Sequence, residues 1–525
     1  MIYVVGSGPA GVSCSYALVK KGIKVTMLDA GVELEPETAS VLEKLQKAKK
    51  WNPLLLKRIR GDMQATVKGV PKKKAYGSDY PYKEISSYMQ IIGKDVECSP
   101  SFAKGGLSTV WGAAVMPYLA DDIKDWPVSI DELAPYYRLV LDFMKIASAK
   151  DDLASLFPLY TENLQNFQQS KQAHLLLKDM QRSKMQLNSA GIFFGSSRLA
   201  VQFTQTKEKH GCVYCGLCMH GCPYKLIYNS AFTVDELKKH NNFEYKTDII
   251  VDKVVEAKGK IKIITHSRID NKKLIFEGSR VFLACGALPT TKIMLESMGA
   301  YNQELQIKDS QYFLMHLLRY KGAGDVTKES LHALAQLYIE IFDKKLDKNS
   351  VHIQLYTYND LYESALRHIF GQAYNILNKA LKRFMSRLII AQGYLHSKSS
   401  SAIYVKLKKG TPNKLILRKN ENSITAKLVR AVAWKLFGNK KYFKFLPLIP
   451  FLKIGKPGES SHYGGSFPMS NNPKKFESDI FGRPFGFKKV HLADSSVFPS
   501  IPAQAITLTI MANAYRIADK SDKLE

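Results

Sequence analysis

The first thirty residues limit the possible folds more than any other part of the chain. An apolar run at residues 2–5 leads directly into residues 6–11, whose sequence GSGPAG matches the pattern G-x-G-x-x-G. Residues 10–21 are expected to form a helix, and residues 24–28 a second strand that ends at Asp29. A glycine-rich turn between a strand and a helix, with an acidic residue about 20 residues later, is typical of a dinucleotide-binding unit. The sequence therefore predicts a Rossmann-like domain.

The residues of this turn have separate physical roles. Gly6 permits the tight turn, Gly8 lets the backbone approach a pyrophosphate, and Gly11 lets the helix pack closely on the strand. The helix N-terminus offers free N–H groups to the phosphates, and Asp29 can accept hydrogen bonds from a ribose. The predicted cofactor-binding residues of this unit are Gly6, Gly8, Pro9, Ala10, Gly11 and Asp29. The pattern alone does not distinguish FAD from NAD.

A second motif indicates electron-transfer chemistry. Four of the seven cysteines fall within eleven residues, in the spacing C-x2-C-x2-C-x3-C-P: Cys212, Cys215, Cys218 and Cys222. Bacterial ferredoxins have this spacing, and the thiolates of the loop hold an iron–sulfur cluster. We therefore predict a 4Fe-4S cluster at these cysteines. In two-cluster ferredoxins the fourth cysteine of the run serves the other cluster, so Cys98 is an alternative fourth ligand.

Two other interpretations of the cysteine run stay open. A structural zinc site more often has its ligands in two separated pairs, and a loop without any cluster is the other alternative. Disulfides are disfavoured because short loops strain the bridge geometry. The remaining cysteines are scattered singly, which is typical of a reducing compartment. No apolar stretch has the length of a bilayer span and no signal peptide precedes the first strand, so we expect a cytoplasmic protein.

The charge of the chain is unevenly distributed. The formal net charge is +29, and residues 361–456 contain 20 Lys and Arg but only 2 Asp and Glu. Such a segment attracts phosphates, nucleic acid or anionic lipid, although charge blocks can also be no more than a well-solvated surface. No recognisable nucleic-acid-binding module accompanies it, so no nucleic-acid partner is expected. An anionic substrate would explain the same charge.

The basic segment also contains apolar patterns. Between residues 366 and 389, apolar residues recur at three- and four-residue steps, which predicts one amphipathic helix. Residues 443–452 form an apolar stretch that is broken by prolines and flanked by lysines. One hypothesis is peripheral contact with the inner face of the membrane through residues 361–456; the alternative is a helix that packs on the core. Residues 401–418 predict a β-hairpin in a sheet that floors the substrate cavity.

Several later segments resemble the glucose–methanol–choline (GMC) family of FAD oxidoreductases. Residues 104–112 (KGGLSTVWG) resemble the family's glycine-rich loop near the flavin, and residues 278–287 (GSRVFLACGA) resemble its strand that returns to the FAD domain. Residues 462–466 (HYGGS) resemble the catalytic-histidine motif. Residues 490–499 (VHLADSSVFP) and 507–512 (TLTIMA) resemble the strand that reaches the flavin and the start of the closing helix.

The resemblance implies FAD as the cofactor and a role for His462 as the general base that takes a hydroxyl proton. It adds these cofactor-binding residues: Gly105, Gly106, Ser108, Gly112, Gly286, Asp494, Ser495 and Thr507. The family normally has a second catalytic Asn or His just before the closing helix. Here that position is Ala503, and the neighbouring Gln504 is the predicted second catalytic residue. An amide can hydrogen-bond the substrate oxygen, but it cannot act as a base.

The predicted fold class is α/β, with a Rossmann-like FAD-binding domain of the GMC type and an α+β substrate-binding domain built on an antiparallel sheet. The FAD-binding domain is expected to comprise residues 1–130, 205–300 and 457–525. Residues 131–204 are predicted to form a helical cap, and residues 301–456 the basic substrate-binding domain.

These features predict an FAD-dependent dehydrogenase that oxidises a hydroxyl group of a small-molecule or lipid-linked alcohol, with a sugar as one candidate. The cluster would pass electrons to a one-electron acceptor protein or a quinone. Two alternatives remain. The missing Asn or His motivates a reductase or desaturase acting on a C=C or C=O bond. The third hypothesis is a non-catalytic electron-transfer flavoprotein in a membrane assembly.

Overall fold

The computed structural model describes residues 1–48, 51–61, 72–206 and 210–521. Short buried runs from distant parts of this chain form a parallel five-stranded sheet in the order β20-β9-β1-β2-β5. Its strands are β1 (Ile2–Val5), β2 (Val25–Leu28), β5 (Phe243–Lys246), β9 (Arg280–Leu283) and β20 (Val490–Leu492). The chain therefore enters this sheet near its start, in its middle and near its end. The expected Rossmann-like arrangement is confirmed.

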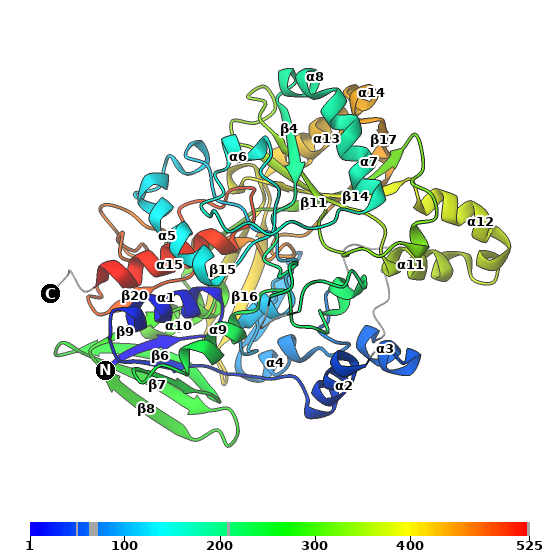
Figure 1. The fold of residues 1–525 in the computed structure, drawn as a ribbon. Helices are drawn as coiled ribbons and strands as arrows, with labels where there is room; N and C mark the ends of the chain where they lie inside the picture. The colour runs from blue at the N-terminus through cyan, green and yellow to red at the C-terminus, as the bar shows by residue number, and fades with distance from the viewer. Residues whose placement is uncertain (49–50, 62–71, 207–209, 522–525) are drawn as a thin grey trace.

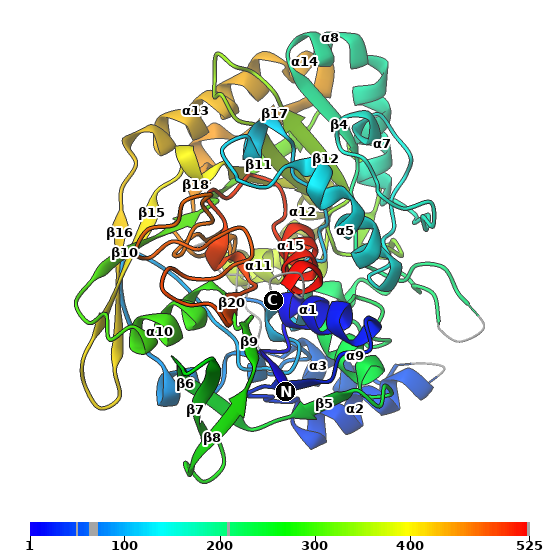
Figure 2. The same cartoon turned by 90° about the vertical axis from the view of Figure 1, so that its left-hand side faces the viewer.

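Helices from several parts of the chain that are far apart in sequence pack on or near this sheet. They are α1 (Pro9–Lys20), α5 (Ile130–Phe143), α9 (Ser230–Leu237), α10 (Ala287–Ser297) and α15 (Thr507–Lys520). Helix α1 packs against α15, and α15 packs in turn against α5. Figure 2 shows α1 in blue directly beside α15 in red. The Ser13 hydroxyl donates a hydrogen bond to the Met511 carbonyl at 2.8 Å, which fixes the two helices against each other.

A larger antiparallel sheet forms the other half of the molecule (Figure 1). Its order is β17-β11-β14-β13-β12-β4, and β18 also pairs with β11. The strands are β4 (Ile192–Ser196), β11 (Tyr312–Arg319), β12 (Leu337–Ile341), β13 (Val351–Tyr356), β14 (Leu388–Leu395), β17 (Phe445–Pro447) and β18 (Lys453–Ile454). Strand β4 comes from residues 131–204, so the segment expected to form a helical cap adds a strand to the sheet of the substrate-binding region.

The two faces of this sheet have different partners because successive strand residues point to opposite sides. On one face, Phe313 and Met315 of β11 join a buried cluster with helices α7 (Lys171–Arg182) and α13 (Ser423–Gly438). On the other face, Leu314 and His316 of the same strand line an internal cavity. The alternating side chains of β11 therefore contribute both to the buried core and to the cavity wall.

Two smaller sheets complete the strand structure. Strands β6 (Ile249–Ala257), β7 (Lys260–Ser267) and β8 (Lys273–Gly278) form an antiparallel meander. The other sheet has the order β19-β10-β15-β16-β3, with β3 (Gln90–Lys94), β10 (Glu304–Asp309), β15 (Ala402–Lys408), β16 (Lys414–Asn420) and β19 (Tyr463–Gly464). The predicted hairpin is confirmed as β15 and β16. It does not floor the cavity, because the cavity wall comes from the seven-stranded sheet.

The amphipathic pattern between residues 366 and 389 forms two helices and part of a strand, so the expectation of one helix is wrong. Helix α11 (Asp360–Phe370) ends at Gly371, which has φ = +51°, and α12 (Ala373–Met385) follows. A positive φ cannot continue an α-helix. Leu388 and Ile389, at the end of the apolar pattern, already belong to β14.

The remaining helices are short or peripheral: α2 (Pro36–Lys47), α3 (Pro53–Arg60), α4 (Ile85–Tyr88), α6 (Leu153–Leu156), α8 (Lys184–Ser189) and α14 (Lys440–Phe443). Among the described residues, none of the helices combines the length and the apolar character required to cross a bilayer.

Candidate active site

A cavity of about 900 Å³ lies between the carboxyl ends of the parallel strands and the open face of the seven-stranded sheet. Four of the five parallel strands contribute residues that lie just beyond their ends: Gly6 after β1, Asp29 after β2, Ala284 after β9 and, two residues on, Asp494 after β20. The carboxyl ends of parallel strands are the usual ligand-binding edge of such a sheet.

The two glycine-rich loops meet at this edge. A Cβ atom on Gly11 would lie 1.8 Å from the Gly6 carbonyl oxygen, so only glycine permits helix α1 to start this close to β1. A Cβ on Gly106, which has φ = +57°, would lie 3.2 Å from the Gly8 Cα. A Cβ on Gly8 would have no neighbour within 4 Å, which leaves its backbone open to a ligand. The Gly105 N–H donates to the Ser7 hydroxyl at 2.8 Å and joins the two loops.

Asp29 is buried beside the first loop. Its Oδ2 accepts hydrogen bonds from the Ser7 hydroxyl at 2.5 Å and from the Tyr245 hydroxyl at 2.9 Å, and its Oδ1 accepts from the Ser7 N–H at 3.2 Å. Burial raises the pKa of this carboxyl to about 6, and these hydrogen bonds act in the opposite direction. Asp29 thus orients the glycine turn and lines the cavity in the position predicted for a ribose contact.

The C-terminal segments approach the same cavity from the other side. The Asp494 carboxylate accepts hydrogen bonds from the Gly286 N–H at 2.9 Å and from the Thr290 hydroxyl at 2.5 Å. It thereby ties the turn after β9 to the turn after β20. Ser495 and Thr507 also line the cavity. Thr507 is the first residue of α15, and no side chain caps that helix, so its first N–H groups face the cavity uncapped.

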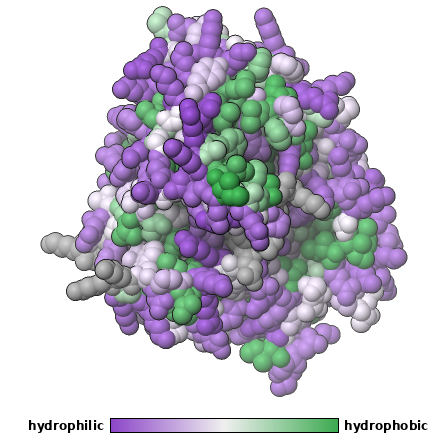
Figure 3. Space-filling view, turned by 90° about the vertical axis from the view of Figure 1, so that its right-hand side faces the viewer, coloured by the Kyte–Doolittle hydropathy of each residue, from purple (hydrophilic) through white to green (hydrophobic). Residues whose placement is uncertain are grey.

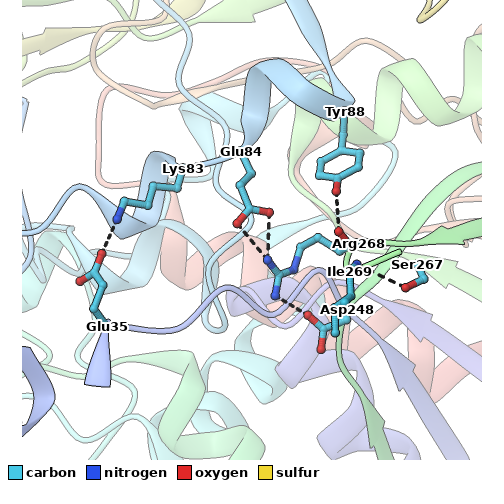
Figure 4. Close-up of polar contacts among 8 residues, drawn as sticks. All are labelled: Glu35, Lys83, Glu84, Tyr88, Asp248, Ser267, Arg268 and Ile269. Carbon is cyan, nitrogen blue, oxygen red and sulfur yellow. Dashed lines mark hydrogen bonds and ion pairs between the residues drawn. The ribbon is translucent and has the colours of Figure 1, made fainter. Parts of the chain in front are cut away.

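The segment before β3 is held over the cavity by a cluster of charged residues (Figure 4). Arg268 binds both carboxylate oxygens of Glu84 at 2.9 Å and also forms an ion pair with Asp248. The Tyr88 hydroxyl donates to the Arg268 carbonyl at 2.7 Å, and Tyr88 itself lines the cavity. A guanidinium that holds two carboxylates at once fixes this segment more firmly than a single exposed ion pair would.

His462 lies in the cavity wall and stacks on Tyr394, with ring centroids 4.8 Å apart and an interplanar angle of 22°. Its backbone is fixed: the carbonyl accepts from the Ser310 N–H at 2.8 Å, and the N–H donates to the Ser460 hydroxyl at 3.1 Å. Within the described chain, no hydrogen bond holds the imidazole, and its Nδ1 is buried without a partner. Burial, together with the nearby His352, lowers the pKa of His462 to about 4. The ring is therefore neutral at pH 7 and able to accept a proton.

The structure places Gln504 away from the cavity. Its amide nitrogen donates to Glu340 Oε2 at 3.2 Å and to the Ser350 hydroxyl at 2.9 Å. Ala503 packs in a small apolar cluster with Tyr394. The cavity wall contains Ala505 but not Gln504. The structure therefore does not bring Gln504, the predicted second catalytic residue, into the cavity lining beside His462.

Other polar side chains stand opposite the glycine loops instead. Gln354, Tyr356, Gln392 and Tyr394 come from β13 and β14 and line the cavity near His462. The Tyr356 hydroxyl donates to Gln354 Oε1 at 2.8 Å. Sequence reasoning missed these residues. For Gln392 and Tyr394, period-two alternation in residues 388–395 was the available signal, but the start of that run was assigned to a helix.

Comparisons with known proteins agree with this architecture. Two family models described as GMC oxidoreductase match residues 90–307 and 453–514, which together are more than half of the chain. A model described as an NAD(P)-binding Rossmann-like domain matches residues 4–34. The chain belongs to the GMC oxidoreductase family. No curated protein sequence matches it significantly.

Solved structures show the same fold over the full length of the chain. Pyridoxine 4-oxidase from Mesorbium loti is 12% identical with a TM-score of 0.61, and the match covers 99% of this chain and 98% of that one. A formate oxidase is 14% identical with a TM-score of 0.62, covering 100% and 99% of the two chains. A variant of Aspergillus oryzae RIB40 formate oxidase, studied for FAD modification, is 12% identical with a TM-score of 0.61, covering 100% and 99%.

As a GMC oxidoreductase, the protein is an FAD-dependent enzyme, and the cavity fits the cofactor. Gly8 and Gly106 would border the pyrophosphate, Asp29 would hold the ribose, and the uncapped start of α15 would face the flavin ring. The open space beside Gly8 and the uncapped N–H groups are complementary to an anionic dinucleotide. Of the predicted cofactor-binding residues, Gly6, Gly8, Pro9, Ala10, Asp29, Gly106, Ser108, Gly112, Gly286, Asp494, Ser495 and Thr507 line the cavity. Gly11 and Gly105 shape the loops from behind.

The cysteine run folds as a loop next to this cavity. Burial, with a smaller contribution from the neighbouring Cys222 and Cys215, raises the pKa of Cys212 to about 11. Burial also raises the pKa of Cys218, and the three other thiols of the run act in the same direction. The four thiols are therefore close enough to influence one another. Backbone N–H groups donate to three of the sulfurs, those of Cys212, Cys218 and Cys222, at 3.4–3.5 Å.

In the described part of the chain, no three His, Cys, Asp or Glu side chains are arranged to hold a single metal ion. Zinc ligands would need to converge, because Zn–S bonds are about 2.3 Å long. Cys98 lies elsewhere: a Cβ on Gly458 would lie 2.5 Å from its sulfur, and the nearby Asp309 and Glu97 act with burial to raise its pKa. Cys98 therefore has different neighbours from the four cysteines of the run.

One lysine connects the cysteine loop with the cavity. Lys73 donates a hydrogen bond from Nζ to the Trp111 carbonyl at 3.1 Å, and both residues line the cavity. Burial lowers the pKa of Lys73 to about 8, whereas Cys218 and Cys222 act to raise it. Met219, inside the cysteine loop, also lines the cavity. The loop and the predicted flavin site therefore share a wall.

Proposed function

We propose that this protein is an FAD-dependent dehydrogenase that oxidises a CH–OH group. The observation that carries the proposal is His462: a neutral imidazole whose ring makes no hydrogen bond within the described residues, held in the cavity that the cofactor loops border. Bound FAD supplies a hydride acceptor. His462 takes the hydroxyl proton, and Tyr394 holds the ring in place by stacking on it.

The polar groups of β13 and β14 take the role that the family gives to an Asn or His. Gln354 and Gln392 can donate hydrogen bonds to a substrate oxygen from the wall that faces the glycine loops. Their amides cannot accept a proton, so the proposal assigns base catalysis to His462. The apolar remainder of the wall excludes water and keeps the imidazole uncharged.

The test is anaerobic reduction of the enzyme-bound flavin by a panel of primary and secondary alcohols. Loss of the visible flavin absorbance with an alcohol as the only donor supports the proposal. Flavin that stays oxidised with every alcohol, yet is reoxidised by an electron-poor alkene or a carbonyl compound after chemical reduction, supports the reductase instead. The position of Gln504 outside the cavity favours that second candidate, since the usual pair is absent.

We further propose that the cysteine loop holds an iron–sulfur cluster that passes electrons to a one-electron acceptor protein or a quinone. The ferredoxin spacing of the four cysteines, N–H donors to three of their sulfurs and a wall that the loop shares with the cavity support this assignment. Among the described residues, no three His, Cys, Asp or Glu side chains are grouped to hold a metal ion, so the assignment rests on the spacing of the cysteines and their place beside the cavity. A bound cluster accepts electrons one at a time.

Metal and flavin analysis of protein purified without oxygen tests this assignment. Flavin together with roughly four irons and matching sulfide per chain supports the electron relay. One zinc per chain, or flavin with neither metal, would overturn it and would make oxygen the candidate acceptor.

A further inference from the structure

We infer that the helical hairpin α11–α12 docks on an anionic membrane surface and that an amphipathic alcohol enters the cavity there. The hairpin projects from one side of the molecule (Figure 1). On α11 only Leu361 is buried, and on α12 only Tyr374, Leu381 and Met385. A helix that packs on the core buries its apolar stripe, but most of this stripe stays outside.

The exposed apolar side chains of this region are large. Ile376 is 86% exposed, Phe451 60% and Ile369 55%; Phe370, Leu377 and Phe384 are also exposed. Figure 3 views the side of the molecule from which the hairpin projects, and apolar side chains gather there among hydrophilic ones. Monomeric proteins rarely leave several large apolar residues together in water unless the surface binds something.

Three of these exposed residues also form the rim of the cavity. Ile369, Phe384 and Phe451 come from α11, α12 and the turn after β17, and each is both exposed and cavity-lining. Leu366 and Leu388 continue the apolar lining inward toward Tyr394 and His462. An apolar path therefore connects the outer surface with the proposed base. Such a path suits an alcohol with an alkyl or isoprenoid chain better than a free sugar.

The basic residues near the cavity rim indicate what kind of surface the hairpin binds. Lys379 and Arg383 of α12 are exposed, and neither has an acidic partner within the described chain. They belong to the segment 361–456, in which Lys and Arg outnumber Asp and Glu by 20 to 2. Basic side chains around an apolar patch are complementary to anionic headgroups over acyl chains. A bilayer is the one partner that attracts these cations and also delivers an amphipathic substrate to the rim.

Vesicle sedimentation with the FAD-loaded full-length protein tests the docking. We expect at least tenfold stronger binding to phosphatidylcholine vesicles containing 30% phosphatidylglycerol than to pure phosphatidylcholine, and weaker binding at high salt. Phe370→Asp combined with Ile376→Asp should reduce binding at least tenfold, as should Lys379→Glu combined with Arg383→Glu. None of these four residues lines the cavity.

Matched controls come from the opposite side of the fold. Ile269 and Ile275 near β8 are 77% and 60% exposed, so Ile269→Asp combined with Ile275→Asp should leave vesicle binding unchanged. The inference would be overturned if the wild-type protein did not bind anionic vesicles. It would also be overturned if the Ile269→Asp, Ile275→Asp control lost as much binding as the Phe370→Asp, Ile376→Asp variant. A protein partner that binds through Phe370 and Ile376 while vesicles are not bound would overturn it as well.

The substrate part of this inference rests on the proposed dehydrogenase function, and a second readout separates the two. The Phe370→Asp, Ile376→Asp variant should keep its FAD and its reduction by a water-soluble alcohol. It should lose at least tenfold in reduction by a long-chain alcohol presented in the anionic vesicles. Selective vesicle binding without flavin reduction by any alcohol would refute the dehydrogenase and leave the docking intact. Equal rates of the variant and wild type with vesicle-bound alcohol would refute entry through the hairpin.

Discussion

Replacement of His462 by alanine, measured over a pH series, tests the proposed base most directly. The pKa of His462 is about 4 because the cavity buries the ring and His352 lies nearby. At pH 7 about one molecule in 1,000 would then be protonated, whereas about one in four would be at the ordinary pKa of 6.5. The wild-type kcat/KM should therefore stay level from pH 8 to about pH 5 and fall tenfold per unit below about pH 4.

The assay is stopped-flow loss of flavin absorbance without oxygen. His462→Ala should lower the rate at pH 7 on the order of 100-fold or more and abolish the acid limb near pH 4, since general base catalysis contributes 10²–10⁴-fold. Its FAD content should equal that of wild type. The exposed His240 provides a matched control, and His240→Ala should change neither the rate nor the profile. A loss of wild-type rate centred near pH 6.5 would refute the lowered pKa of His462. A normal rate in His462→Ala would refute its role as the general base.

Three further outcomes follow from the site. Gly11→Ala should abolish FAD binding, because its Cβ would lie 1.8 Å from a carbonyl oxygen; Gly438→Ala, with open space around it, should retain full flavin content, and equal flavin in both proteins would contradict the close approach. Gln504→Ala should lower the free energy of unfolding by about 1–3 kcal/mol, seen as a lower melting temperature, yet change flavin reduction less than threefold; a hundredfold loss would restore a catalytic role. Cys218→Ser should lose most of its iron while Cys98→Ser keeps it, and iron analysis with the reverse result would make Cys98 a ligand.

Sequence patterns predicted the cofactor half of the protein well, because its signals are local. The turn at residues 6–11 lies between a strand and a helix as expected, and His462 and Thr507 reach the same cavity. Gln504 could not be placed from sequence. A neighbouring position in a loop can point its side chain either way, and long-range contacts with Glu340 and Ser350 decide its direction.

The substrate half was predicted less well, for two physical reasons. The apolar spacing continues across Gly371 and into Leu388, so a helical period concealed both a helix end and the start of a strand. Gln354 and Tyr394 come together through the antiparallel pairing of β13 with β14, where His352 lies opposite Tyr394. A local sequence pattern does not predict the pairing register of strand residues that are about forty positions apart.

The late position of β20 and α15 in the chain has a consequence for biosynthesis. Helix α1 (Pro9–Lys20) buries its side against α15 (Thr507–Lys520), so segments far apart in the sequence must meet to complete this packing. While the polypeptide emerges from the ribosome, that apolar side stays uncovered and the cofactor pocket lacks one of its walls. The cofactor pocket is therefore complete only after β20 and α15 have been synthesised and have packed against the N-terminal elements.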